Sequence, residues 1–168
     1  VGAEQLRMAR AHFIALAEEF TLGDDGTLAP CRPIADVLAP FHALALPGIV
    51  WQPSERAEFM PGLRKRIFNE GPKNLRAPVE IDVTVTPWDV RRVDGVYTAN
   101  TLHIMHWPQV QAFFANLPVV AKPGTVLAIY GPFRYGGQYT SASNASFDEM
   151  LRARDPESGI REFEAVDQ

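Results

Sequence analysis

Cysteine, long apolar runs and positive charge are all scarce in this sequence, and each shortage excludes a class of protein. Cys31 is the only cysteine in 168 residues, which excludes an internal disulfide and predicts a reducing compartment, with Cys31 in a structural role. No stretch is long and apolar enough to span a bilayer, and no signal peptide is visible. We therefore expect a cytoplasmic protein. Its start at Val1 instead of Met indicates a chain that is processed, trimmed or incomplete.

The charge balance excludes a second group of partners. The sequence has 16 Lys and Arg against 20 Asp and Glu, for a net charge of −4 and a pI of about 5.5. Because nucleic acids and anionic membranes repel an acidic surface, neither is expected as a partner. The basic run 64–66 is interpreted as the solvated face of a helix. A small molecule is the partner that we expect, and formation of a homo-oligomer stays open.

Potential metal ligands are too few for a metal site. His103 and His106 have the i, i+3 spacing of two ligands on a helix, but no third or fourth ligand accompanies them at a suitable spacing. The sequence therefore predicts no metal. Length and composition, with 46% hydrophobic and 21% charged residues, indicate a single globular domain over 1–168.

The hydrophobic pattern alternates between strands and helices along most of the chain. Apolar residues at helical spacing predict helices, and alternating or continuous apolar runs predict strands. The expected helices are 3–20, 33–41, 57–70, 107–121 and 145–155, and the expected strands are 49–51, 79–85, 93–99 and 125–131. Strands joined by helical crossovers predict an α/β fold, in which a parallel sheet carries helices on both faces.

Polar residues gather where the predicted strands end. Glu55 follows the first strand, Asp82 lies in the second, and Asn100 follows the third. In a parallel sheet these ends share one rim, which is where ligands bind. An acid there can accept both hydroxyls of a ribose, a second acid can accept an adenine amino group, and an amide suits an amino-acid-like group. The pattern predicts a nucleoside site, although each residue taken singly reads as ordinary surface.

Several longer words of the sequence resemble one family. They are "WQPSE", "EIDVT", "VDGVYTANTLHIMHW" and the stretch from "KPGTVLAIYGPFRYGGQYTSASN" to "FDEMLRARDPESGIREFEAVD". From about Leu46 to Asp167 the chain resembles the methyltransferase-like 26 family, also called domain of unknown function 938. That family is similar to class I S-adenosylmethionine-dependent methyltransferases. The resemblance implies a Rossmann-like α/β sheet of that class.

The resemblance also implies roles for single residues. Glu55 would hold the ribose of S-adenosylmethionine, Asp82 would lie near the adenine, and Ala99 and Asn100 would lie beside the cofactor. The residues implied on the acceptor side are Pro132, Phe133, Tyr139, Thr140, Ser141 and Asn144. Tyr130 and Tyr139 are the only candidates for a catalytic group, and the methyl acceptor stays unknown.

The resemblance breaks down at the start of the sheet. A class I fold has a first strand followed by a glycine-rich turn, because the backbone passes close to the methionine part of the cofactor there. Residues 29–47 contain no glycine. We therefore expect strand one and its turn to be absent, together with the C-terminal hairpin, since the chain stops at Gln168. Each backbone group left unmatched beside such a gap would cost about 1–3 kcal/mol.

Three explanations of the gap stay open. A segment is missing from the sequence between Pro40 and Ala43, which we favour, or the protein is a natural variant that has lost the turn, or residues 33–41 form a strand. A continuous chain across that junction would contradict the first explanation. The sequence thus predicts a methyltransferase acting on a small molecule. The alternative is a non-catalytic or repurposed protein with the same fold.

Overall fold

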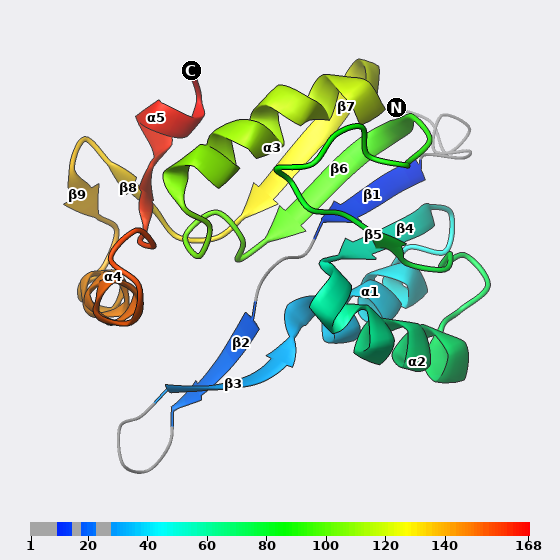
Figure 1. Ribbon diagram of the computed structural model, residues 1–168, viewed down its shortest axis with the longest axis horizontal. Coiled ribbons are helices and arrows are strands. Elements are labelled where there is room, and N and C mark those ends of the chain that lie inside the picture. Colours follow the sequence, from blue (N-terminus) through cyan, green and yellow to red (C-terminus); the bar gives the residue numbers. More distant parts are fainter. Residues whose placement is uncertain (1–9, 15–17, 23–27) are drawn as a thin grey trace.

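A parallel five-stranded sheet forms the centre of the molecule (Figure 1). The computed structural model describes residues 10–14, 18–22 and 28–168, with side chains from Ala39 onward. The sheet has the order β5-β4-β1-β6-β7, and every pairing in it is parallel. The strands are β1 (Arg10–Ile14), β4 (Val50–Glu55), β5 (Val79–Glu80), β6 (Val93–Ala99) and β7 (Ala121–Tyr130). The predicted α/β class and parallel sheet are confirmed.

The central strand β1 is the main departure from the sequence prediction. Residues 3–20 were expected to form one helix, but β1 and β2 (Glu18–Leu22) are strands, so the prediction is wrong for these residues. The rest of that span lies outside the described residues. β1 pairs with β4 on one side and β6 on the other, in the place where strand one was expected to be absent. As a strand, this segment can hydrogen-bond the backbone groups of both β4 and β6. We infer that this pairing outweighs the preference for a helix that its apolar spacing indicates.

The chain is continuous where a break was expected. Helix α1 (Ile34–Ala45) runs through Pro40 and Ala43, which contradicts a missing segment there. The same helix shows that residues 33–41 do not form a strand. The glycine turn still has no counterpart in the sequence directly after β1, since the eight residues that follow it, ALAEEFTL, contain no glycine. Within the described ranges, β2 instead pairs with β3 (Leu28–Pro33) in a hairpin apart from the main sheet (Figure 1).

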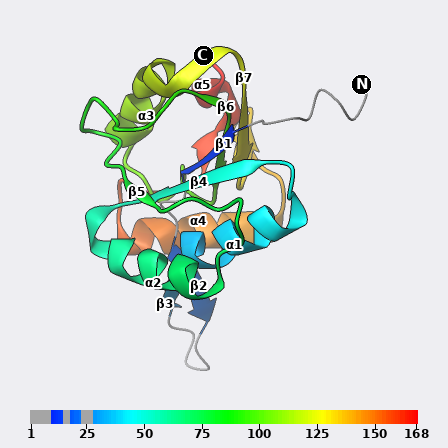
Figure 2. The ribbon, with the colours of Figure 1, turned by 90° about the vertical axis from the view of Figure 1, so that its right-hand side faces the viewer.

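Helices cover both faces of the sheet, as predicted, with α3 on one side and α1 and α2 on the other (Figure 2). Val96 and Tyr97 are neighbours in β6, so their side chains point to opposite faces. Val96 packs in a buried cluster with Phe113 of α3, whereas Tyr97 packs against a second cluster with Trp51 and Leu63. Helix α2 spans Met60–Glu70 and follows the short helix η1 (Ala57–Phe59). Helix α3 spans Trp107–Val120.

Strand β5 is much shorter than predicted. The alternation over 79–85 predicts a full strand, but only Val79 and Glu80 pair with β4. The reason is local, because the Asp82 carboxylate accepts hydrogen bonds from the backbone and hydroxyl of Thr84. Such a side-chain turn competes with a strand ladder.

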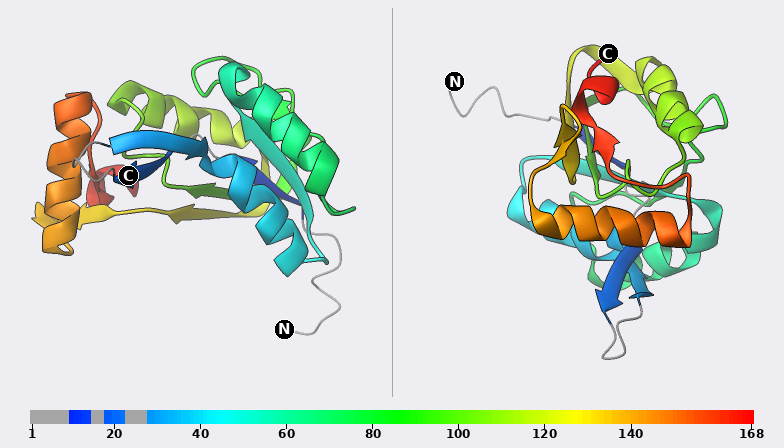
Figure 3. Two further views of the ribbon diagram at one scale, coloured as in Figure 1. Left: turned by 90° about the horizontal axis from the view of Figure 1, so that it is seen from below. Right: turned by 90° about the vertical axis from the view of Figure 1, so that its left-hand side faces the viewer.

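A layer of small elements lies beyond the ends of β6 and β7, on the side toward which these strands point (Figures 1 and 3). Its elements are β8 (Phe133–Tyr135), β9 (Gln138–Tyr139), α4 (Ala142–Arg154), β10 (Arg161–Glu162) and α5 (Phe163–Val166). Gly136 and Gly137 make the tight turn between β8 and β9 with φ of 55° and 78°. β7 ends the order of the main sheet, and no described strand pairs with its outer edge.

Candidate functional site

The carboxyl ends of the central strands lie at one level. Ile14 of β1 stands opposite Ser54 of β4 and Thr98 of β6, and Thr98 stands opposite Ile129 of β7. The residues that follow these positions therefore form a common rim. This arrangement brings the predicted residues Glu55, Ala99, Asn100 and Tyr130 to the same edge of the sheet.

Glu55 closes β4 and is almost completely enclosed by protein. It is 1% exposed, and its Oε1 accepts a hydrogen bond from the backbone N–H of Arg56 at 2.9 Å. Its backbone carbonyl accepts from the N–H of Ile81 at 3.0 Å, which ties the end of β4 to the loop that carries Asp82. The two predicted acids thus lie on neighbouring segments, but the Glu55 carboxylate is closed to a ligand in this conformation.

Asp82 is exposed, and its carboxylate is engaged within its own loop. Oδ1 accepts from Thr84 Oγ1 at 2.6 Å and from Thr84 N at 2.8 Å. The hydroxyl of Thr84, then its backbone N–H, hold the pKa of Asp82 below its usual range, with a smaller effect of the Arg56 charge. A ligand amino group could still reach the exposed carboxylate.

The polar cluster after β6 is satisfied internally, except at Asn100. Thr98 and Thr101 are buried, Thr98 donates to the Thr101 hydroxyl at 2.7 Å, and Thr101 donates to the carbonyl of Ala99 at 3.0 Å. Asn100 has φ of 53° and donates its N–H to the carbonyl of Tyr130 at 2.8 Å. The chain bends there, and the Asn100 side chain is the polar group of this cluster that faces a cavity.

That cavity, which we call the aromatic cavity, has a volume of about 400 Å³. It is lined by Asn100, Tyr130, Gly131, Pro132, Phe133, Tyr135, Thr140, Asn144 and Phe147. Four of these side chains are aromatic and none is charged. Its polar groups include the pair in which Asn144 Nδ2 donates to Thr140 Oγ1 at 2.6 Å. Such a wall suits a flat, uncharged ligand.

Two of the predicted residues on the acceptor side do not line this cavity. Tyr139 donates its hydroxyl proton to Asp148 Oδ2 at 2.6 Å. Ser141 caps helix α4 and accepts the backbone N–H of Asn144 at 3.2 Å. Both therefore support the wall of the cavity without facing it.

Asp148 is the central acceptor of the layer behind the aromatic cavity. It is 2% exposed and also accepts from Arg152 Nε at 2.9 Å and from the backbone N–H of Ile160. Burial alone would raise the pKa of Asp148, but the hydrogen bonds from Arg152, Tyr139 and Ile160 outweigh it and hold the pKa below its usual range. The Tyr139 hydroxyl is therefore engaged by a buried, ionised carboxylate and does not line the aromatic cavity.

A second cavity of about 210 Å³ opens on the other side of the turn after β6. It is lined by Arg56, Glu58, Phe59, Ile104, Met105, Gln109, Leu151, Arg154, Asp155 and Ser158, and we call it the inner cavity. Its walls come from the segment after Glu55 and from the turn after Asn100. Its lining combines apolar residues, such as Phe59, Ile104 and Leu151, with charged ones, such as Arg56 and Asp155.

His103 lies in the turn between the two cavities and was not predicted as a site residue. It is 5% exposed, its ring packs edge-on against Phe147 with centroids 5.3 Å apart, and none of the described residues hydrogen-bonds the ring. A Cβ added to Gly131, which lines the aromatic cavity, would lie 3.7 Å from His103 Nδ1. A methyl group at Gly131 would therefore fit beside the His103 ring at ordinary van der Waals distance.

Burial, and next the charge of Arg161, lower the pKa of His103 to about 4, while Asp148 opposes the shift. His103 is therefore neutral at physiological pH. The signal for it in the sequence was its place three residues after Asn100, whereas its i, i+3 spacing from His106 suggested only a metal ligand.

Other parts of the described chain add no further candidate. A third cavity, of about 220 Å³, lies beside the first residues of β4, β5 and β6 and contains none of the predicted residues. In the described ranges no three His, Cys, Asp or Glu side chains come together as metal ligands would. None of the helices found there combines the length and the apolar character needed to cross a membrane.

Two residues near the rim present polar groups that S-adenosylmethionine could bind, the exposed carboxylate of Asp82 and Asn100 beside the aromatic cavity. Glu55 closes β4, Asp82 follows β5 and Asn100 follows β6, with β1 between β4 and β6 in the sheet, and residues that follow Glu55 and Asn100 line the inner cavity. The fit is weakest at Glu55, which is enclosed, and after β1, where the sequence has no glycine.

Comparison with known proteins agrees with this geometry. Residues 37–168 match the family model described as "Protein of unknown function (DUF938)". The chain belongs to this family. The match covers the rim from Glu55 to Gly131 and the whole C-terminal layer, so the DUF938 residues form both cavities.

Solved structures similar to this DUF938 chain include several methyltransferases. Mitomycin 7-O-methyltransferase MmcR is 15% identical with a TM-score of 0.68, over 94% of this chain and 40% of the other. An O-methyltransferase family 2 protein from Planctomyces limnophilus, in complex with apigenin, is 14% identical with a TM-score of 0.69, over 95% and 44%. Human N-acetylserotonin methyltransferase with SAM is 12% identical with a TM-score of 0.67, over 90% and 38%. At these identities the likeness shows the methyltransferase fold, and this chain spans about two fifths of those proteins.

Proposed function

We propose that this DUF938 protein transfers a methyl group from S-adenosylmethionine to a small, uncharged acceptor. The observation that carries the proposal is the pair of cavities on either side of the β6 turn, at the rim where Asn100 lies. The fold of the neighbours supports it, because solved relatives of this fold bind SAM or SAH.

The residues of this chain would divide the work between the two cavities. Glu55, Asp82 and Asn100 would hold the cofactor, which supplies an electrophilic methyl group when bound. The aromatic cavity would orient the acceptor, and orientation supplies most of the rate when the leaving group is already good. Its uncharged lining selects against carboxylate and phosphate substrates.

His103 would take the proton of an acceptor hydroxyl or amine. It is neutral and lies behind Gly131, whereas the Tyr139 hydroxyl is bound to Asp148 and Tyr130 is 65% exposed. The two tyrosines that the sequence suggested are thus the poorer candidates.

Calorimetric titration of the chain with S-adenosylmethionine and S-adenosylhomocysteine tests the proposal. We expect micromolar binding that weakens at least about tenfold in Asn100→Ala and in Glu55→Ala, since each change removes a polar contact. Glu80→Ala, at an exposed position of β5, is the matched control and should bind as the wild type does. Absence of binding by a protein that unfolds cooperatively would contradict the proposal.

A non-catalytic protein with this fold is the second candidate. Two observations favour it, the enclosure of the Glu55 carboxylate and the absence of glycine in the eight residues after β1. It predicts that the wild type does not bind S-adenosylmethionine, so that Glu55→Ala has no cofactor affinity to weaken.

A further inference from the structure

The turn after β6 is built on hydrogen bonds from a segment more than fifty residues later. We call residues 101–106 the β6 turn and residues 155–161 the clamp segment. Four successive carbonyls of the turn, those of residues 102–105, all accept hydrogen bonds from this segment. Backbone carbonyls in such a turn have no partner in a helix or sheet, so these bonds decide which conformation the turn adopts.

Arg161 makes the widest contact of the four. Its Nε donates to the carbonyl of Leu102 at 3.0 Å, and a terminal nitrogen donates to the carbonyls of Met105 and of Glu157, the latter at 3.0 Å. One guanidinium therefore joins both ends of the β6 turn to the clamp segment. The two carbonyls between them accept from Gly159 N at 2.8 Å and Ser158 Oγ at 3.0 Å.

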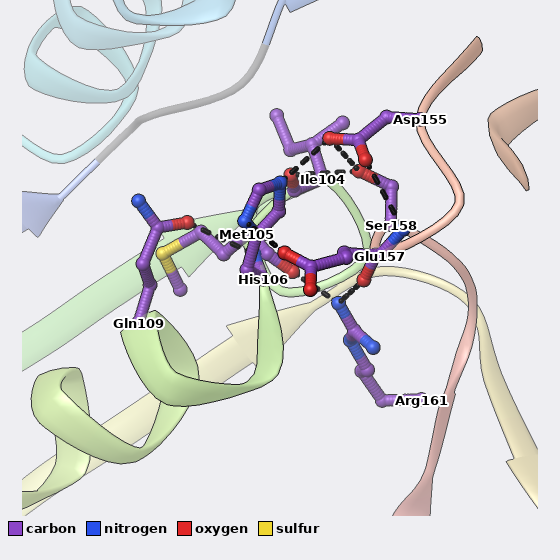
Figure 4. Close-up of polar contacts among 8 residues, drawn as sticks. All are labelled: Ile104, Met105, His106, Gln109, Asp155, Glu157, Ser158 and Arg161. Atoms are coloured by element: carbon purple, nitrogen blue, oxygen red, sulfur yellow. Dashed lines mark hydrogen bonds and ion pairs between the residues drawn. The ribbon is translucent and has the colours of Figure 1, made fainter.

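His106 fastens the far end of the same turn (Figure 4). Its Nε2 lies 2.7 Å from Asp155 Oδ2, and its Nδ1 lies 2.7 Å from Glu157 Oε2. Its backbone N–H donates to Gln109 Oε1 at 2.9 Å, which starts helix α3. The clamp segment thus grips the turn at both ends and at each carbonyl between.

The β6 turn lines the inner cavity and directly follows a residue that lines the aromatic cavity. Ile104 and Met105 face the inner cavity, and Asn100, just before the turn, faces the aromatic cavity. His103 lies within the β6 turn, and its backbone carbonyl accepts a hydrogen bond from the N–H of Gly159. A displacement of the turn would move the wall of the inner cavity, and Asn100 links the turn to the aromatic cavity.

We propose that Arg161 is a positioning residue that sets the shape of the β6 turn, and through it the placement of Asn100 and His103 between the cavities. For the ligands this inference rests on the proposed function, but the effect on the turn does not. Arg161 acts in two separable ways, by bonding both ends of the turn and by placing a positive charge near His103.

Two variants separate these effects. Arg161→Lys keeps the charge but has one nitrogen, which cannot reach Leu102 and Met105 together. Arg161→Gln removes the charge as well. Arg134→Lys is the control, because Arg134 lies in the same small sheet and pairs with Glu162 at 2.8 Å without touching the β6 turn.

The measurement is the pH titration of the His103 ring by NMR, together with the affinity for S-adenosylhomocysteine and the melting temperature. We expect the pKa of His103 to rise from about 4 in Arg161→Lys, because a turn that is no longer held at both ends buries the ring less, and to rise further in Arg161→Gln, which also loses the charge that opposes protonation. Asp148 on α4 is the facing carboxylate, and in Arg161→Gln its effect, which raises the pKa of His103, would no longer be opposed by the Arg161 charge. Affinity should fall at least about tenfold in both. Arg134→Lys should leave the titration and the affinity unchanged.

The outcomes separate the two proposals. If the wild type does not bind S-adenosylhomocysteine, the proposed function fails, and the titration of His103 still decides the role of Arg161. If both Arg161 variants lower the melting temperature while the His103 titration stays at its wild-type position, Arg161 is merely structural and the inference is overturned. An equal response of Arg134→Lys would overturn it as well.

Discussion

The end of β4 and the end of β6 hold equivalent places on the rim, yet they are built in opposite ways. Glu55 at the end of β4 is 1% exposed and bonds to Arg56, its neighbour in the chain. At the end of β6, Asn100 faces a cavity, and the turn beyond it is held by residues 155–161. One end is closed around its own carboxylate. The other end faces the aromatic cavity, and hydrogen bonds from residues 155–161 satisfy the backbone carbonyls of the turn that follows it.

The difference traces to two segments of the sequence that contact each other only in the folded protein. "TLHIMHW" contains the β6 turn and "RDPESGIR" contains the clamp segment, and in the structure they bond to each other. Each word read alone is a string of polar residues with no obvious chemistry. Together they form one hydrogen-bonded unit, and residues of both segments line the inner cavity.

Removing the support behind the β6 end should have the largest effect. Asp148→Ala leaves the hydroxyl of Tyr139, the guanidinium of Arg152 and the N–H of Ile160 without their acceptor. We expect the free energy of unfolding to fall by about 3–5 kcal/mol, measured by urea denaturation. Asp82→Ala is the control near the β4 end, with an expected loss below about 1 kcal/mol because Asp82 is exposed. Equal losses would erase the difference between the two ends.

The buried His103 should make the β6 end sensitive to acid. The folded protein lowers its pKa to about 4 from the usual 6.5, so the unfolded chain binds the proton more readily between these values. Stability is therefore full above pH 6.5 and falls as the pH drops toward 4, by on the order of 3 kcal/mol.

His103→Gln should flatten this fall, which thermal melting between pH 7 and pH 4 would follow. His42, whose pKa is also lowered by burial, contributes in the same direction and provides the control variant His42→Gln. An unchanged acid slope in His103→Gln would contradict the assignment of a neutral, buried ring.

A glycine in the clamp segment should show a moderate effect. Gly159 has φ of 142°, and a Cβ there would lie 2.8 Å from Asp148 Oδ1. Gly159→Ala should therefore lower the free energy of unfolding by about 2 kcal/mol, since an alanine is strained at that φ and the carboxylate is fixed by its partners. Gly48→Ala, where nothing lies within 4 Å, should change it by less than about 0.5 kcal/mol. Chemical denaturation of both variants would test this contrast.

The smallest effect is expected beside the β4 end. Arg56 and Glu58 form an ion pair of 2.9 Å with both side chains about half exposed. Glu58→Ala should change stability by less than about 0.5 kcal/mol, because exposed pairs are screened by water and salt. A loss above 1 kcal/mol at physiological ionic strength would mean that this end is also held by its charges.

Much of the fold follows from the sequence because local pattern and tertiary place agree. β6 and α3 were predicted within a residue of their observed bounds, since an apolar run and a helical spacing stand alone there. β1 was missed because its residues also fit a helical spacing. Its strand conformation follows only from its pairing with β4 and β6, which the local sequence does not show. β5 was overextended because the Asp82 turn competes with pairing.

The site was predictable in place but not in detail. That polar residues at strand ends meet on a rim follows from parallel pairing, so Glu55 and Asn100 could be named from the sequence. Whether a side chain faces a cavity depends on contacts with residues elsewhere in the chain. Tyr139 was therefore predicted to line the acceptor side, although its hydroxyl donates to Asp148 instead. The role of Arg161 depends on a contact across 59 positions, which no local pattern encodes.

The most direct test of the account is to map S-adenosylhomocysteine binding by NMR on the ¹⁵N-labelled chain. We predict that shift changes concentrate at the β6 end, from Ala99 to Met105, with smaller changes at Glu55 and at the clamp segment. Changes centred instead on the 220 Å³ cavity beside Val50 and Arg91, or none at millimolar ligand, would contradict a cofactor site at this rim.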